Sequence, residues 1–402
     1  MKTVIAAMAM LISGSMLCAN AVAATVELIV TVPEHTPCDA TLTLGGDFNG
    51  WNPQASDYQM VKLGDGRFRY VFSNIAQGKV LNFKVTRGSW ETVEIADSGA
   101  NRDNRNIAVT REVQQHELTV AEWADMSTKE APSTIVGNVV MQDIELPTFP
   151  GVRQLRIYLP PDYATGSKHY PVIYMSDAQN VFDNKTANAG EWQMDELMES
   201  LAAQNSALLS IVVAIDHAGD NRTMEYLPFR YGGASWSLFD WNKGKLGKGK
   251  QFADWLANDL KQHIDTTYRT LPEREHTTIM GSSMGGLIAC YTALRHQQTF
   301  SKAACYSSAF VKQLVGDEWI DYINTTPKRH PVRFHMDMGD NEFGLFGDDI
   351  LDETQEVHDA LLAAGFAPEN VRYQVIKGGT HDEPSWRSRT LGILTWLNSP
   401  RK

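Results

Sequence analysis

Cysteine is scarce in this chain, which excludes a fold held together by a disulfide framework. Only four of the 402 residues are cysteines. Cys18 lies in an N-terminal apolar run, and the other three, Cys38, Cys290 and Cys305, are an odd number that cannot pair completely. Cys290 and Cys305 could be neighbours, but a large core needs no covalent staple. We therefore expect buried thiols rather than a bridge.

Clusters of positive charge are also missing. The chain has 36 Lys and Arg against 48 Asp and Glu, a formal net charge of -12. Nucleic acids and anionic membrane surfaces both reward clustered Lys and Arg, so neither is an expected partner. No Cys/His cluster has the spacing of metal ligands, and no glycine-rich nucleotide loop is present, so we expect no metal and no cofactor.

Long apolar runs are absent except at the N-terminus. There the run from Val4 to Leu17 precedes Ala21-Val22-Ala23, the small-x-small pattern of a signal peptide. We expect residues 1–23 to be removed and the mature protein to be periplasmic or extracellular. Cys18 also allows a lipoprotein, although the preceding leucine is larger than the residue expected there. No later run reaches bilayer length, so no other membrane span is expected.

The rest of the chain divides into two patterns. At 43% hydrophobic and 21% charged residues, it has the composition of a soluble protein large enough for two domains. Residues 24–125 alternate in short segments separated by turn residues, which predicts an antiparallel β-sandwich. A polar, proline-containing stretch at 126–134 predicts a linker. Residues 135–402 alternate buried strand-like runs with helical segments, which predicts a doubly wound α/β domain.

One short stretch in the second domain carries a recognisable chemistry. Gly281-Ser282-Ser283-Met284-Gly285-Gly286 lies between an apolar strand-like run and a helical run. A nucleophile elbow needs small residues around its serine, because the turn is strained and packs tightly between strand and helix. We predict Ser283 as the nucleophile. The alternative is a glycine-rich turn that buries an ordinary serine.

A serine nucleophile needs a base, and the base needs an orienting acid, here expected in the chain order serine, acid, histidine. His381 follows the strand-like run 371–376 in a glycine-containing loop, which suits a general base. The turn after the run 332–338 offers three carboxylates. An orienting acid must lie just past the strand end, which favours Asp340 or Glu342 over Asp337.

In the first domain, two tryptophans lie beside turns. The pieces are Gly46-Asp47-Phe48-Asn49-Gly50-Trp51-Asn52-Pro53 and Trp90-Glu91, followed by Asn104-Arg105. They resemble the starch-binding and glycogen-binding carbohydrate modules. The resemblance implies an immunoglobulin-like β-sandwich in which Trp51 and Trp90 form a platform for sugar rings of an α-glucan, with Glu91 and Asn104 bonding hydroxyls. The alternative is that Trp51 is core and the domain is a spacer.

The second domain resembles the Putative esterase family of α/β-hydrolases over residues 135–398. This family includes esterase D, feruloyl and acetylxylan esterases, siderophore esterases and mycolyltransferases. The matching pieces are Asp177-Ala178-Gln179-Asn180-Val181-Phe182-Asp183, residues 221–228, Gly281–Gly286, Gly339–Glu342, and Gly379-Thr380-His381-Asp382 with Trp386-Arg387. The resemblance implies an α/β-hydrolase fold and places the acid three residues after Gly339, at Glu342, with Asp340 as the alternative.

An oxyanion hole needs two N–H donors aimed at the developing charge. The N–H of Met284, next after the nucleophile, is one, and an N–H at Ala178 or Gln179 is the expected second. Ala178 stands where relatives often have glycine. Four further aromatics could line the substrate pocket or could simply pack: Trp236, Phe239, Trp241 and Phe310.

These patterns and the two resemblances predict an exported serine esterase acting on a carbohydrate-linked acetyl or feruloyl ester, or on an ester of an α-glucan. The sugar platform is expected in a separate domain from Ser283. Three alternatives remain from the sequence. The ester could be a catecholate siderophore lactone, or a sugar hydroxyl could replace water in an acyltransferase. The third, non-enzymatic alternative is a carbohydrate-binding protein with a vestigial hydrolase domain.

Overall fold

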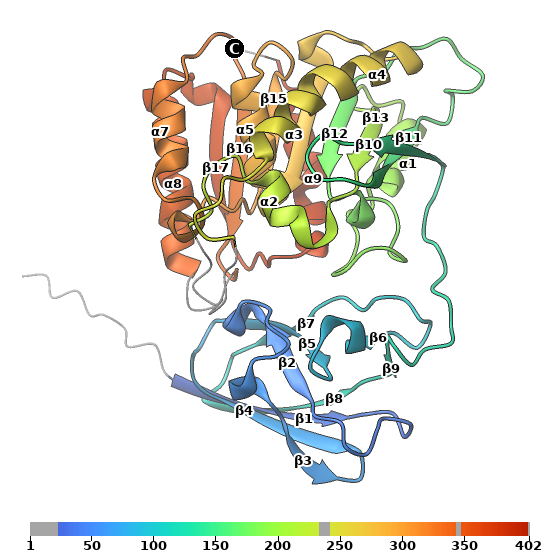
Figure 1. Cartoon of the computed structure of the whole chain (residues 1–402), viewed down its shortest axis with the longest axis vertical. Coiled ribbons are helices and arrows are strands. Elements are labelled where there is room, and N and C mark those ends of the chain that lie inside the picture. The colour runs from blue at the N-terminus through green and yellow to red at the C-terminus, as the bar shows by residue number, and fades with distance from the viewer. Residues whose placement is uncertain (1–22, 233–241, 343–346, 401–402) are drawn as a thin grey trace, which may run out of the picture.

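Two domains lie one above the other in the computed structural model, which describes residues 23–232, 242–342 and 347–400 (Figure 1). Each domain has its own buried hydrophobic cluster. The expected signal peptide, except Ala23, and Trp236, Phe239 and Trp241 lie outside the described residues. Within those residues, no helix combines the length and hydropathy that crossing a membrane requires.

The N-terminal domain is built from strands in two main sheets. One sheet has the order β3-β4-β1-β8 and the other β2-β5-β7, with β6 paired to β9 beside them. The strands are β1 (Ala23–Thr31), β2 (Thr43–Gly46), β3 (Val61–Gly64), β4 (Arg67–Ala76), β5 (Val80–Thr86), β6 (Glu94–Ile95), β7 (Arg105–Ala108), β8 (Val113–Thr119) and β9 (Glu122–Trp123).

Alternation along these strands forms the core of the domain. Val26, Leu28 and Val30 of β1 are fully buried, while the residues between them are partly exposed. This is the pattern of a sheet with one face on the core. The expectation of a purely antiparallel sandwich is wrong in one respect, because β1 and β8 pair in parallel. The chain passes through the second sheet before it re-enters the first one as β8, and β8 then runs in the same direction as β1.

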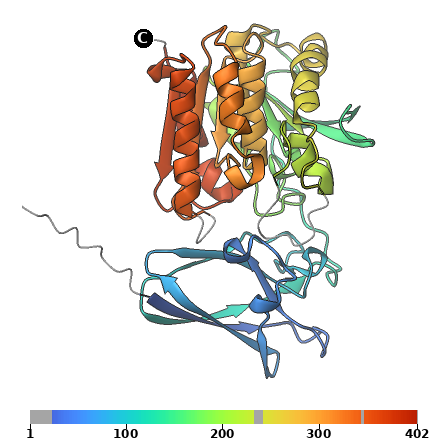
Figure 2. The ribbon, with the colours of Figure 1, turned by 60° about the vertical axis from the view of Figure 1, so that its left-hand side comes forward.

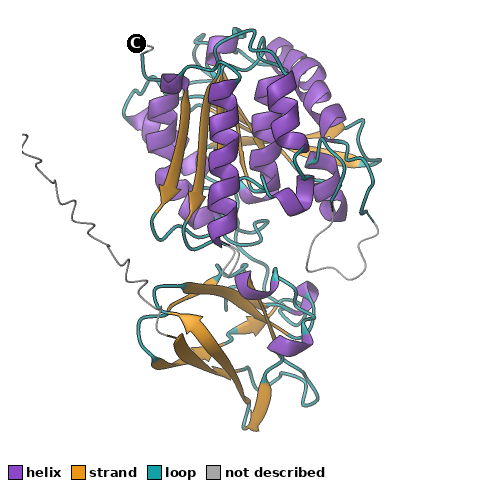
Figure 3. Ribbon diagram, turned by 90° about the vertical axis from the view of Figure 1, so that its left-hand side faces the viewer, coloured by secondary structure: helices purple, strands orange, loops and turns teal. Residues whose placement is uncertain are grey.

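The second domain is a sheet with helices on both faces (Figures 2 and 3). Its strand order is β10-β11-β13-β12-β14-β15-β16-β17, antiparallel at the β10-β11-β13 end and parallel from β13 to β17. The strands are β10 (Asn138–Glu145), β11 (Val152–Leu159), β12 (Val172–Ser176), β13 (Ile211–Ile215), β14 (Thr277–Ser282), β15 (Lys302–Tyr306), β16 (Arg333–Gly339) and β17 (Val371–Ile376).

The helices connect these strands and shield the buried sheet from water. They are α1 (Met194–Ala203), α2 (Arg222–Tyr226), α3 (Gly249–Trp255), α4 (Lys261–Thr267), α5 (Met284–Arg295), α6 (Lys312–Val315), α7 (Glu318–Thr325), α8 (Gly347–Ala363) and α9 (Glu383–Leu397). A π-helical turn, Leu256–Leu260, joins α3 to α4. In sheets of this kind, ligands bind beyond the carboxyl ends of the parallel strands.

Cys290 and Cys305 form a disulfide, so the expectation of two buried thiols is wrong. Cys290 lies on α5 and Cys305 on β15, and α5 packs over that strand. The packing brings their Cα atoms to 6.0 Å, within the range that a disulfide spans. Cys38 is exposed and unpaired among the described cysteines.

The chain between the domains is anchored to the second one. β9 ends at Trp123 and β10 begins at Asn138, so the predicted linker, 126–134, lies between them. Ser133 Oγ donates to Asp183 at 2.8 Å, and the Thr134 N–H donates to the same carboxylate at 3.0 Å. These bonds fix the end of the linker on the α/β domain.

Candidate active site

Ser283 occupies the sharp turn between β14 and α5. Its backbone has φ 57° and ψ -125°, a strained conformation for a residue with a side chain. The turn is held by a hydrogen bond from the Ser283 N–H to the Tyr306 carbonyl at 3.0 Å. Close packing explains why residue 285 is a glycine, because a Cβ there would lie 2.3 Å from Ser176 Oγ. The Gly-x-Ser-x-Gly stretch therefore has the local geometry of a nucleophile elbow.

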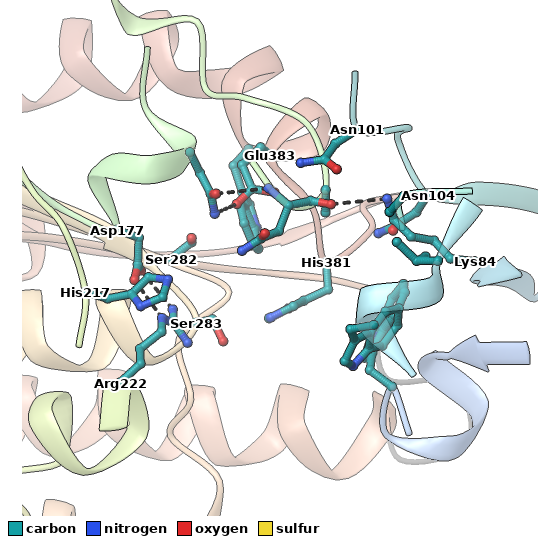
Figure 4. Close-up of a pocket in the computed structure, with 18 residues that line it drawn as sticks. Lys84, Asn101, Asn104, Asp177, His217, Arg222, Ser282, Ser283, His381 and Glu383 are labelled. Carbon is teal, nitrogen blue, oxygen red and sulfur yellow. Dashed lines mark hydrogen bonds and ion pairs between the residues drawn. The ribbon is translucent and has the colours of Figure 1, made fainter. Parts of the chain in front are cut away.

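His381 and Glu342 meet at the end of the sheet beside this turn. His381 Nδ1 lies 2.8 Å from Glu342 Oε2. Because a carboxylate only accepts, the imidazole donates through Nδ1 and leaves Nε2 for another partner. Ser283 and His381 line one pocket, and Figure 4 shows the imidazole pointing toward the serine. The structure thus brings together the three residues that the sequence analysis singled out.

Neighbouring side chains and one backbone N–H hold Glu342 and His381 in place. Glu342 is 1% exposed, and its Oε1 accepts from Ser307 Oγ at 2.5 Å and from the Gly339 N–H at 2.8 Å. Ser307 Oγ in turn accepts from Trp386 Nε1 at 2.8 Å. The Trp386 ring packs edge-on against His381, with centroids 5.1 Å apart. Sequence reasoning missed Ser307, since nothing in its local pattern marks it.

Asp340, the alternative acid, has a different partner. Its Oδ1 accepts from the Gly378 N–H at 2.6 Å, which ties the loop after β16 to the loop after β17. Asp337 lies in β16 and pairs with Arg389 and His335 at 2.8 and 2.9 Å. Neither carboxylate has the contact with His381 that Glu342 has.

The expected oxyanion donors lie at the starts of two helical segments. Met284 begins α5, and Ala178 begins the 3-10 turn Ala178–Asn180 after β12. First-turn N–H groups have no partner within their own helix, so they can face a ligand. The turn is entered through Asp177, which has φ 60° and a bidentate ion pair with Arg222 at 2.6 and 2.8 Å. This pair fixes the Asp177 side chain directly before the turn that Ala178 begins.

The pocket around Ser283 is formed by both domains. It has a volume of about 590 Å³, within the usual size of small-molecule sites. The α/β domain contributes Asp177, Asn180, Asn188, Ala189, His217, Arg222, Ser282, Ser283, His381, Glu383 and Trp386, and the N-terminal domain contributes Trp51, Lys84, Trp90, Val93, Asn101, Asn104 and Ala124. Trp51 and Trp90 thus belong to a separate domain from Ser283, as expected, but the two domains close on each other at this point, so the tryptophans and the serine line one pocket.

The other predicted site residues differ in their placement. Asn104 lines the pocket. Glu91 lies on the exposed turn Trp90–Thr92, outside the residues that line the pocket. Phe310 is buried and stacks on Trp319, with centroids 5.5 Å apart, so it is packing rather than pocket wall. Among the described residues, no group of three or more His, Cys, Asp or Glu side chains could hold a metal ion.

Glu383 is a second buried carboxyl in the pocket. It begins α9 and is 5% exposed, and its Oε1 accepts from Asn180 Nδ2 at 2.7 Å. Burial raises the pKa of this carboxyl from 4.5 to about 8. The raised pKa favours the neutral, protonated form of this carboxyl near neutral pH.

Replacing Glu383 with glutamine is expected to remove a pH dependence of stability. Between pH 4.5 and about 8 the unfolded carboxyl has lost its proton while the folded one keeps it, so the wild type loses stability as pH rises through this window. The amide stays neutral throughout. The melting temperature of Glu383→Gln relative to wild type should rise between about pH 5 and about pH 8.5. A difference that stays constant across that range would contradict the burial argument.

Comparison with known proteins identifies the second domain. The model of the Putative esterase family matches residues 147–397, well over half of the chain. An uncharacterised protein of Bacillus subtilis, YbbA, is 26% identical over 251 residues, which are 61% of this chain and 93% of that protein. The ferric enterobactin esterase of Salmonella typhimurium has the same overall fold, with a TM-score of 0.54 at 15% identity over 89% of this chain and 88% of that one.

The N-terminal region has relatives of another kind. An alpha-amylase of Niallia circulans is 36% identical over 115 residues, 29% of this chain but only 9% of the amylase. The similarity is therefore to a small part of a much larger protein. A region similar to part of an amylase thus precedes a domain that aligns with the esterase model along nearly its whole length. The chain belongs to the Putative esterase family and is a carboxylic ester hydrolase of the α/β-hydrolase type.

Proposed function

We propose that the protein hydrolyses carboxylic esters through Ser283, His381 and Glu342. The observation that carries the proposal is the 2.8 Å contact between His381 Nδ1 and Glu342 Oε2 at the pocket that Ser283 lines. A serine hydroxyl is a weak nucleophile until a base takes its proton, and an imidazole is a good base when its other nitrogen is held by a carboxylate.

The reaction proceeds in two halves. Ser283 Oγ attacks the ester carbonyl carbon while His381 Nε2 takes the hydroxyl proton, and Glu342 stabilises the imidazolium that results. The C–O bond to the alcohol then breaks, and His381 gives its proton to the departing oxygen. In the second half, a water molecule loses a proton to His381 and attacks the acyl carbon. The bond from that carbon to Ser283 Oγ then breaks, and His381 returns its proton to Oγ, which releases the acid and restores the serine.

The negative oxygen formed in each half needs donors that are already in place. The N–H of Met284 and an N–H at Ala178 or Gln179 fill this role in the proposal. One such donor is worth about 3 kcal/mol of transition-state stabilisation. Asp177 and Arg222 act as positioning residues, because their ion pair holds the turn from which the second N–H projects.

The natural ester is carbohydrate-linked in this proposal, and the protein is exported. The carbohydrate link is supported by the amylase-like N-terminal region. Export is supported by the apolar segment at 4–17 and by the Cys290–Cys305 disulfide, because disulfides persist mainly in oxidising compartments.

A panel of substrates tests the proposal most broadly. Wild type and Ser283→Ala should be assayed with an aryl acetate, an acetylated sugar, a feruloyl sugar and a catecholate lactone. Hydrolysis of a sugar ester by the wild type alone is the expected result. Preference for the lactone would identify a siderophore esterase, and acyl transfer to added sugar in place of hydrolysis would identify an acyltransferase.

A further inference from the structure

We propose that Trp51 and Trp90 form the sugar-binding part of the active site itself, rather than an independent polysaccharide site. The sugar they bind is the alcohol part of the ester that Ser283 attacks, so the substrate is held between the two domains. This inference rests on the proposed function and adds to it the location and chemistry of the leaving-group site.

The two indoles lie in the same pocket as the reacting groups. Their ring centroids are 6.4 Å apart and their planes differ by 36°, so the two rings are neighbours tilted against each other. Trp90 is 40% exposed, unusual for so large an apolar side chain. Both line the pocket of about 590 Å³ that also contains Ser283 and His381. A molecule in this pocket can therefore contact the indoles and also reach the serine.

The backbone is built to hold both rings in this place. Trp51 has φ 59° and follows Gly50 at φ 64°, so two successive residues adopt the left-handed conformation. Strain of this kind persists only where the surroundings fix it, and it gathers at ligand sites. Gly45 makes room for the second ring, because a Cβ there would lie 2.9 Å from Trp90 Cη2.

Polar groups beside the rings indicate a sugar rather than a purely aromatic ligand. Figure 4 shows Lys84, Asn101 and Asn104 across the pocket from Ser283. Asn104 is 8% exposed, and its Oδ1 has no hydrogen-bond partner among the described residues. An unpaired buried acceptor favours a ligand that donates hydrogen bonds. A pyranose does so through its several hydroxyls while its apolar C–H face packs on an indole, and a feruloyl group, with one phenolic hydroxyl, offers fewer donors.

Hydrogen bonds between the two domains hold Lys84 and Asn101, and with them this side of the pocket, in position. Lys84 Nζ donates to the Asn188 carbonyl at 3.1 Å, and Asn101 Nδ2 donates to the Ala187 carbonyl. Both acceptors lie in the α/β domain close to Asn180, whose Oδ1 accepts from the Asn188 N–H at 3.2 Å. The N-terminal domain is thus hydrogen-bonded to the loop that forms the opposite side of the pocket.

The test compares three esters with the full-length protein. They are 4-nitrophenyl acetate, methyl ferulate and an O-acetylated xylotriose or maltotriose, measured with wild type, Trp90→Ala and Trp51→Ala. Leu63→Ala is the control, since Leu63 is exposed on β3 at the end of the molecule away from the α/β domain (Figure 1). We expect kcat/KM for the sugar acetate to fall at least about tenfold in either tryptophan variant, mainly through KM, because a stacked ring is lost. The other two esters and the control should stay close to wild type.

The outcomes separate this inference from the proposed function. Unchanged sugar-ester kinetics in both tryptophan variants, or an equal loss on all three esters, would overturn the inference while the esterase activity stands. A loss on methyl ferulate as large as that on the sugar acetate would assign the rings to the acyl group instead. If the wild type hydrolyses 4-nitrophenyl acetate but no sugar ester, the inference that the alcohol part of the substrate is a sugar is wrong. A wild type that hydrolyses none of the three would defeat the proposed function itself.

Discussion

Ser283→Ala is expected to lower kcat for ester hydrolysis by about 10⁶-fold, because the members of a catalytic triad act as a unit and the covalent step has no other nucleophile. The fold should be unaffected. Alanine fills the same tight turn with one atom fewer, and the turn is held by the backbone bond between Ser283 and Tyr306. Steady-state kinetics with an aryl acetate and a thermal melt measure the two effects.

Ser282 provides a matched control for this change. It is the neighbouring serine and lines the same pocket, but it lies at the end of β14 rather than in the elbow. Ser282→Ala should retain activity. If both serine variants kept activity within tenfold of wild type, the assignment of the nucleophile would be wrong.

Glu342→Gln is expected to lower kcat by about 10³ to 10⁴-fold, less than the loss of the serine. In the proposed mechanism the carboxylate orients His381 and stabilises its cationic form, and an amide stabilises that cation only weakly. The amide would also disturb the contacts of Oε1 with Ser307 and Gly339, so the pH profile of kcat/KM should be measured along with kcat.

Asp340→Asn is the matched control for the acid, because it removes a carboxylate from the same turn. Asp340 accepts from the Gly378 N–H, and an asparagine oxygen can keep that bond. Its kcat should stay within about tenfold of wild type, and its pH profile should keep its shape. A larger loss in Asp340→Asn than in Glu342→Gln would show that the wrong carboxylate has been chosen.

Features that depend on adjacent residues could be predicted from the sequence. Six neighbouring residues are enough to predict the elbow around Ser283. The carboxylates beside Gly339 are enough to predict that an acid lies in the turn after β16. The alternation of strand-like runs with helical segments in residues 135–402 predicts an α/β domain, and the strands and helices of this region confirm it. The choice of Glu342 over Asp340 was different, since it came from the family resemblance. The contact with His381 now supports it.

Features that depend on how distant segments pack could not be predicted. The Cys290–Cys305 bridge requires α5 to lie over β15, and spacing along the chain does not reveal which face of a helix a thiol occupies. Ser307 reaches Glu342 only because the ends of β15 and β16 meet. The contribution of Trp51 and Trp90 to the pocket of Ser283 depends on the path of the linker and on bonds such as Lys84 to Asn188.

The central claim is that Ser283 carries the acyl group, and covalent labelling tests it most directly. A fluorophosphonate reacts with serines that an adjacent base activates, and peptide mass spectrometry locates the adduct. The account predicts one phosphonyl group per molecule, on the peptide that contains Ser283, in wild type and in Ser282→Ala. Labelling should disappear in Ser283→Ala and be slowed strongly in His381→Ala. An active wild-type enzyme that takes up no label on Ser283, or is labelled equally well without His381, would contradict it.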